Sequence, residues 1–132
     1  MSWDWRLHVF DHIDIGVSDL AESRRFYETV LSALRIPLLT TSERYYEWPH
    51  FGITLEHPRA TDVHLCFRAR SRAEVDGFHR AGIEAGFRSN GEPGLRDVYG
   101  PGYYAAYLLD PDGNNVEALF REAPNVGAGF DL

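Results

Sequence analysis

The chain contains an internal repeat, and this repeat is the feature that most limits the folds it can adopt. Residues 12–35 align without a gap on residues 64–87, at an offset of 52. Five positions are identical at that offset, and the first of them pairs His12 with His64. A repeated unit of this length predicts two copies of one supersecondary module that pack against each other.

Both copies begin with a strand that leads into a helix. Polar and apolar residues alternate at the start of each copy, which predicts a strand with His12 on one face of the first and His64 on the same face of the second. The sequences DLAE at 19–22 and SRAE at 71–74 are capping-box patterns, so each predicts the start of a helix.

Strand-like segments follow each predicted helix. In the first copy they cover 37–41, 44–48 and 51–56. In the second they cover 88–89 weakly, then 103–109 and 115–120. Residues 90–102 contain four Gly and two Pro, which predicts a long loop there.

The element order is therefore β-α-β-β-β, repeated once. We expect an α+β fold in which two βαβββ modules, about 10–57 and 62–121, pair into a half-open barrel with the helices outside. Residues 1–132 then form a single domain, because a chain of this length supports one core.

The composition limits the kinds of binding partner and the cellular location that we expect for this protein. The net charge of −7 argues against non-specific nucleic-acid binding, which needs a basic surface. No apolar run reaches membrane-spanning length, and the first residues lack the pattern of a signal peptide. The single cysteine, Cys66, cannot form an intrachain disulfide, so we expect a cytoplasmic protein. Cys66 shares the face of His64 and Arg68 in its alternating strand, and we expect it to be inert packing rather than a nucleophile.

Three side chains are candidates for a metal site. In a barrel of two equivalent modules, His12 and His64 face each other and Glu117, in the last strand, lies beside them. Two imidazoles and a carboxylate that converge can hold a divalent ion and leave coordination positions open. The residues alone also fit a second interpretation, in which the histidines are surface groups and Glu117 faces water on an amphipathic strand.

Three longer stretches carry a resemblance to a known family: DHIDIGVSDLAESRRFYETVL, VHLCFRARSRAEVDGFH and YYAAYLLDPDGNNVEALF, which together cover most of residues 11–120. They resemble the vicinal oxygen chelate superfamily, which includes glyoxalase I, extradiol dioxygenases, fosfomycin-resistance thiol transferases and bleomycin-resistance binding proteins. The stretch GEPGLRDVYGPGYYAAYLLDPDGNNVEA further resembles small bacterial members whose activity is generally unassigned.

This resemblance implies a paired βαβββ fold and a divalent metal, Fe²⁺, Mn²⁺, Zn²⁺ or Ni²⁺, held by His12, His64 and Glu117. It implies a metal-dependent enzyme, dioxygenase-like or lyase/isomerase-like, that acts on a small oxygen-rich substrate chelated to the metal. It also implies a homodimer, in which His12 and His64 meet either within one chain or across two.

The resemblance further suggests how the branches of the family would differ at this site. Glyoxalase-like isomerases add a glutamate from the last strand of the first module, where Glu56 is the available carboxylate and Thr54 is the alternative occupant. Extradiol dioxygenases carry a tyrosine ten residues before the metal glutamate, across the same hairpin. Tyr107 has that position here, opposite the strand of Glu117, so Tyr107 and Glu117 would be the catalytic side chains. Tyr107 also fits an aromatic strand without a chemical role.

Two other branches lead to different pocket residues. A thiol transferase needs an anion pocket, for which Arg68 and Arg96 are the candidates. A binding protein that sequesters an aromatic molecule would use an aromatic cleft, with Tyr45, Tyr46, Trp48, Tyr99 and Tyr103 as its candidate lining. Such binding proteins typically lack the metal ligands, and all three positions are filled here, which favours an enzyme.

Overall fold

The computed structural model describes residues 7–122. The first module contains β1 (Ile13–Gly16), α1 (Leu20–Ala33), β2 (Thr40–Thr41), β3 (Tyr45–Trp48) and β4 (Phe51–Thr54). The second contains β5 (His64–Arg68), α2 (Arg72–Glu84), β6 (Arg88–Leu95), β7 (Tyr104–Leu109) and β8 (Asn115–Phe120), with a short 3-10 helix, η1 (Asp97–Tyr99), before β7. The predicted β-α-β-β-β order is confirmed in both modules.

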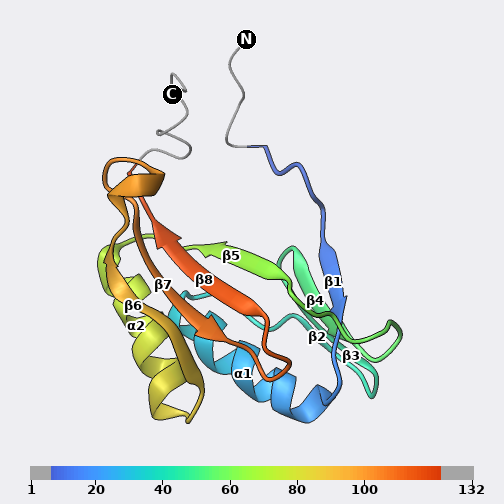
Figure 1. Cartoon of the computed structure of the whole chain (residues 1–132). Helices are drawn as coiled ribbons and strands as arrows, with labels where there is room; N and C mark the ends of the chain where they lie inside the picture. The colour runs from blue at the N-terminus through green and yellow to red at the C-terminus, as the bar shows by residue number, and fades with distance from the viewer. Residues whose placement is uncertain (1–6, 123–132) are drawn as a thin grey trace.

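The two modules build sheets of the same topology. The strand orders are β1-β4-β3-β2 and β5-β8-β7-β6, and in each sheet the first strand pairs in parallel with the last. Both helices lie on one side of the sheets, as Figure 1 shows, and the sheets do not close on each other. The fold is therefore the expected α+β pair of βαβββ modules with a half-open arrangement.

Both predicted helix starts are confirmed by side-chain caps. The Asp19 carboxylate accepts a hydrogen bond from the Glu22 backbone N–H at 3.0 Å, and the Ser71 hydroxyl accepts one from Glu74 at 3.1 Å. The helices then turn their apolar faces to a shared core. Phe26 of α1 and Phe78 of α2 are completely buried there.

The turn between β7 and β8 ties the second module to the first. The buried Asp110 carboxylate accepts a hydrogen bond from the Tyr27 hydroxyl of α1 at 2.6 Å. Asn114 accepts one from the Val63 backbone N–H and donates one to the Ala60 carbonyl, in the segment that links the modules. These contacts hold the two modules in one relative orientation.

The loop predicted over 90–102 is wrong in its first half, because β6 continues to Leu95. β6 is the last strand in its sheet, and its pairing with β7 shifts register between Ser89 and Gly91 and again before Gly94. An edge strand with such bulges tolerates Pro93, whose missing N–H would break the ladder of a central strand. No helix within residues 7–122 is long and apolar enough to span a bilayer.

Candidate functional site

The sheet of the second module has one face packed on the core and one face open. Along β5, Leu65 and Phe67 pack on the core, whereas His64, Cys66 and Arg68 are exposed on the opposite face. The strand register continues this open face onto β8 and β7, where Cys66 lies opposite Glu117 and Glu117 lies opposite Tyr107. The predicted placement of Tyr107 across from the glutamate strand is confirmed.

Glu117 is buried on this open face, with only 1% of its side chain exposed. Its Oε1 lies 2.8 Å from Nε2 of His64, and its Oε2 accepts a hydrogen bond from the Tyr103 hydroxyl at 2.5 Å. Both carboxylate oxygens therefore have a defined partner. The interpretation of Glu117 as a water-facing residue is wrong, because a carboxylate is buried in this way only where partners compensate for the lost hydration.

Two tyrosines adjoin this carboxylate. Burial is the main cause that raises the pKa of the Tyr103 phenol above its ordinary value, and the hydrogen bond to Glu117 raises it further. Burial and the charge of Glu117 likewise raise the pKa of Tyr107, whose ring centroid lies 6.3 Å from that of His64. Both phenols therefore remain protonated at neutral pH and can donate hydrogen bonds.

Cys66 lies on the open face, where the alternation of the strand placed it with His64 and Arg68. Because it is exposed there and pairs with Glu117 in the ladder, it does not serve as inert packing. Desolvation by surrounding side chains is the main cause that raises the pKa of the Cys66 thiol, and the charge of Glu117 raises it further. The positive charges of Arg121 and Arg68 lower this pKa. The alternation of β5 decides this placement, because a strand shifted by one residue presents the other set of side chains.

Arginines surround the same group of residues. The guanidinium of Arg96 lies 5.4 Å from the ring centroid of Tyr107 and donates a hydrogen bond to the Glu92 carbonyl at 2.7 Å. The guanidinium of Arg121 lies 5.3 Å from the ring centroid of Tyr103. Arg121 is not among the residues predicted from the sequence, although it follows the end of β8 four residues after Glu117 and so continues the same face.

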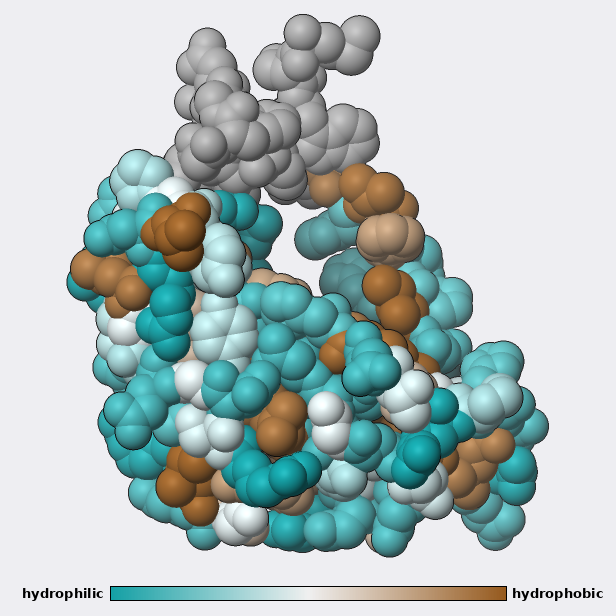
Figure 2. Space-filling model, viewed as in Figure 1, coloured by the Kyte–Doolittle hydropathy of each residue, from teal (hydrophilic) through white to brown (hydrophobic). Residues whose placement is uncertain are grey.

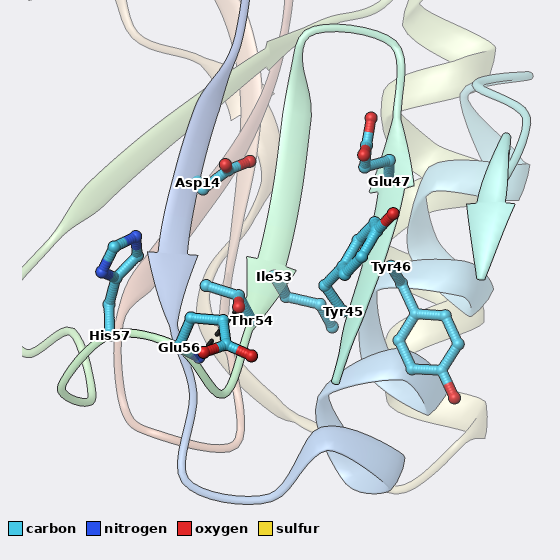
Figure 3. Close-up of a pocket in the computed structure, with 8 residues that line it drawn as sticks. All are labelled: Asp14, Tyr45, Tyr46, Glu47, Ile53, Thr54, Glu56 and His57. Atoms are coloured by element: carbon cyan, nitrogen blue, oxygen red, sulfur yellow. Dashed lines mark hydrogen bonds between the residues drawn. The ribbon is translucent and has the colours of Figure 1, made fainter. Parts of the chain in front are cut away.

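The open face of the first module contains a cavity of about 220 Å³. Figure 3 shows Asp14 from β1 and Glu47 from β3 on either side of β4. Glu56 lines this cavity and forms an ion pair with Arg44, and its place in a substrate pocket stays a prediction. The other lining residues are Tyr45, Tyr46, Ile53, Thr54 and His57.

Trp48 does not line a cleft, which corrects the sequence prediction. Its side chain is buried in the core, near Tyr27 and Phe51. The ring of Tyr46 lies toward the helices, with the Arg24 guanidinium of α1 4.8 Å from its centroid, although Tyr46 also contributes to the cavity wall. Both Tyr45 and Tyr46 thus line the cavity, and Trp48 does not.

The strand registers show which residue of the first module is equivalent to Glu117. Cys66 pairs with Glu117 in the second module, and Asp14, its equivalent at the repeat offset, pairs with Gly52 in the first. Gly52 therefore stands at the position equivalent to Glu117. Glu56 follows the end of β4, so it does not supply a carboxylate at that position.

His12 lies just before β1 and is exposed. Its Nδ1 lies 2.7 Å from Oδ1 of Asp11, and this hydrogen bond raises the pKa of His12. Within residues 7–122, no three His, Cys, Asp or Glu side chains gather closely enough to hold a metal ion. One chain thus brings His64 and Glu117 together but does not bring His12 to them.

The comparisons with known proteins agree with this fold. Residues 9–118 match the model of the Glyoxalase/Bleomycin resistance protein/Dioxygenase superfamily, and the chain belongs to that superfamily. The structure is similar to that of a glyoxalase/bleomycin resistance protein from Albidiferax ferrireducens T118, with 37% identity, a TM-score of 0.74, and coverage of 86% of this chain and 99% of that one.

Two more distant structures share the fold. Lactoylglutathione lyase from Agrobacterium tumefaciens is 19% identical with a TM-score of 0.61, and the match covers 84% of this chain and 92% of that one. Oxidase ChaP-H2 is 20% identical with a TM-score of 0.63, and the match covers 87% and 94%. No curated protein matches the sequence.

Proposed function

We propose that this protein is a metal-dependent enzyme of the dioxygenase or lyase/isomerase type, acting on a small oxygen-rich molecule at a site shared by two copies of the chain. The observation that carries this proposal is the buried carboxylate of Glu117, held between His64 and Tyr103 on an open sheet face. Catalytic carboxylates are typically placed in this way, in a desolvated position with fixed partners.

The residues present fit a divalent metal. Imidazole nitrogen and carboxylate oxygen are the donors that Fe²⁺, Mn²⁺, Zn²⁺ and Ni²⁺ accept. Two donors that contact one ion at about 2.1 Å and roughly at right angles lie about 3 Å apart. The 2.8 Å between Nε2 of His64 and Oε1 of Glu117 meets this condition. His64 and Glu117 would hold the metal together with His12.

Charge on the two open faces supports a site shared by two copies. The first module's face carries Asp14 and Glu47, whereas the second module's face carries Arg68, Arg96 and Arg121. Opposite charges favour the first module of one copy facing the second module of another. In that arrangement His12 comes from one copy, and His64 with Glu117 from the other.

When bound, the metal would supply Lewis-acid stabilisation of charge on substrate oxygens. Tyr103 holds Glu117 in place, and Tyr107, on the same face, donates a hydrogen bond to a substrate oxygen. Gly52 has no side chain that could bind a metal, so the proposed metal would have three protein ligands. Three ligands favour dioxygenase-type chemistry over the chemistry of an isomerase with four. This choice of branch rests on the family resemblance.

Metal content tests the proposal. Purified protein is expected to retain about one divalent ion per chain, and His64→Ala and Glu117→Ala are each expected to lose it, since a ligand is removed. His79→Ala is the matched control, because His79 lies on α2 and bonds to Ser89. Full retention by both ligand variants would contradict the proposed site.

The reaction type is tested separately. Protein loaded with Fe²⁺ under nitrogen is exposed to catechols and then to O₂, and ring cleavage is expected if the dioxygenase branch is correct. Turnover of a hemithioacetal instead would point to an isomerase. Tight binding of an aromatic molecule without turnover by any metal-loaded form would identify a sequestering protein.

A further inference from the structure

The segment that leads into β1, residues 7–12, extends away from the body of the molecule (Figure 1), and we name it the arm. It is held to its own chain through His50, whose ring centroid lies 4.4 Å from that of His8 and whose Nδ1 lies 2.8 Å from the carbonyl oxygen of Asp11. Three large apolar side chains of the arm are exposed, namely Leu7 at 58%, Val9 at 72% and Phe10 at 64%. Adjoining apolar side chains that are exposed in this way usually mark an interaction surface.

A second group of exposed apolar side chains surrounds η1. Leu95 is 48% exposed, Val98 84% and Tyr99 58%. Among the described residues, the arm and the surroundings of η1 together hold six of the nine large apolar side chains that are exposed, so this exposure is concentrated rather than scattered. Figure 2 shows hydrophobic residues at these two places, at the upper right and the upper left, on either side of a hollow.

Each of these two surfaces adjoins one part of the proposed metal site. The arm ends at His12. On the other side, η1 is tied to Tyr103, because the Arg96 backbone N–H donates to the Tyr103 carbonyl oxygen at 2.7 Å and the rings of Tyr99 and Tyr103 lie 5.3 Å apart. The Tyr103 hydroxyl in turn donates to Glu117. A contact between the two surfaces would therefore bring His12 close to Glu117.

The position of the two surfaces favours a contact between two copies of the chain. Within one chain they lie apart, since β1 and His50 hold the arm on the first module while η1 belongs to the second (Figure 1). In a dimer with twofold symmetry, each copy offers its arm to the other copy's η1, so the same contact forms twice. The charges described above favour the same pairing, with the acidic face of the first module opposite the basic face of the second.

We propose that the arm of one copy docks on η1 of a second copy, with its three apolar side chains packed on those around η1, and that this contact brings His12 to His64 and Glu117. The inference rests on the function proposed above for the role of His12 at the metal. The contact itself is driven by burial of apolar surface, and it forms without a metal ion.

A double-mutant cycle, measured by sedimentation of metal-free protein, tests the contact. Val9→Ser and Val98→Ser are each expected to raise the dissociation constant of the dimer about tenfold or more, because each removes apolar area from both contacts of the dimer. The double variant is expected to dissociate less than the product of the two single effects, since both changes remove the same contact. Ile83→Ser is the matched control, because Ile83 is also exposed, at 42%, but lies on α2.

Crosslinking identifies which surfaces meet. Differently tagged Val9→Cys and Val98→Cys chains, each also carrying Cys66→Ser so that no other thiol is present, are mixed and treated with a short thiol-to-thiol crosslinker. A crosslinked pair of unlike chains is expected. No such pair is expected when an Ile83→Cys chain replaces the Val98→Cys chain.

The outcomes separate this inference from the proposed function. A wild-type dimer with a fully additive cycle, or with no crosslink between Val9→Cys and Val98→Cys chains, would overturn the inference and leave the shared metal site standing. The expected contact in a protein that retains no metal would support the inference and contradict the proposed function. A wild-type chain that stays monomeric would overturn the inference and the shared site together, and so would a monomer whose arm binds lipid vesicles instead.

Discussion

Nε2 of His64 and Oε1 of Glu117 lie 2.8 Å apart on neighbouring parallel strands, β5 and β8. The backbone ladder between these strands sets the separation of the two side chains, and Tyr103 holds the other carboxylate oxygen. Two of the three proposed metal ligands are therefore placed together within one chain before any ion or second copy binds. A preformed pair of donors loses little conformational entropy on binding.

Tyr103→Phe is expected to weaken metal retention about tenfold, since removing a hydrogen bond that orients a ligand typically costs 10–100-fold in affinity. The protein should remain folded, because only one hydroxyl is lost. Tyr104→Phe is the matched control: its hydroxyl bonds to Asp76 at 2.6 Å on the helix side of the same sheet. Metal affinity is measured by competition with a chelator. Equal affinities in the two variants would contradict a role for Tyr103 at the site.

Tyr27→Phe is expected to lower the free energy of unfolding by about 1–2 kcal/mol at pH 7, because the buried Asp110 loses a donor. Burial raises the pKa of Tyr27 in the folded state, so its contribution is full below about pH 10 and declines as pH rises further. The difference between wild type and variant should therefore narrow above pH 10. Urea unfolding at pH 7 to 11 measures it, and a difference that stays constant would refute the linkage.

Gly16→Ala is expected to destabilise the fold by about 1–3 kcal/mol, because a Cβ at this position would clash with the backbone carbonyl oxygens of Pro58 and His57. Gly77→Ala is the matched control in α2, where an added Cβ meets no atom. There we expect stabilisation by about 0.5–1 kcal/mol from the better helix propensity of alanine. Thermal unfolding measures both, and changes of the same sign would contradict the packing described at Gly16.

Much of the fold could be predicted from the repeat. The element order and both helix caps follow from local patterns, and the tight turn at 110–113 predicts that Tyr107 faces Glu117. The alternation along β5 was assigned correctly, with Cys66 on the face of His64 and Arg68. The side of β3 was harder to assign. Trp48 was expected to line a cleft but is buried in the core, because a shift of one residue exchanges the two faces of a strand.

Other features depend on contacts between distant residues. The edge position of β6 permits a strand through Pro93, and no local pattern marks an edge. The relative placement of the modules depends on contacts such as that between Tyr27 and Asp110, 83 residues apart in sequence. The place of His12 relative to His64 follows from that placement, so the repeat alone could not decide whether they meet within one chain.

Subunit mixing tests the shared metal site most directly. A dimer made of one His12→Ala chain and one Glu117→Ala chain, isolated through two different tags, retains one complete ligand set if each set combines His12 of one chain with His64 and Glu117 of the other. We expect this mixed dimer to hold about half the metal of wild type, while each variant alone holds almost none. A mixed dimer without metal, or a wild-type protein that binds metal as a monomer, would contradict the shared site.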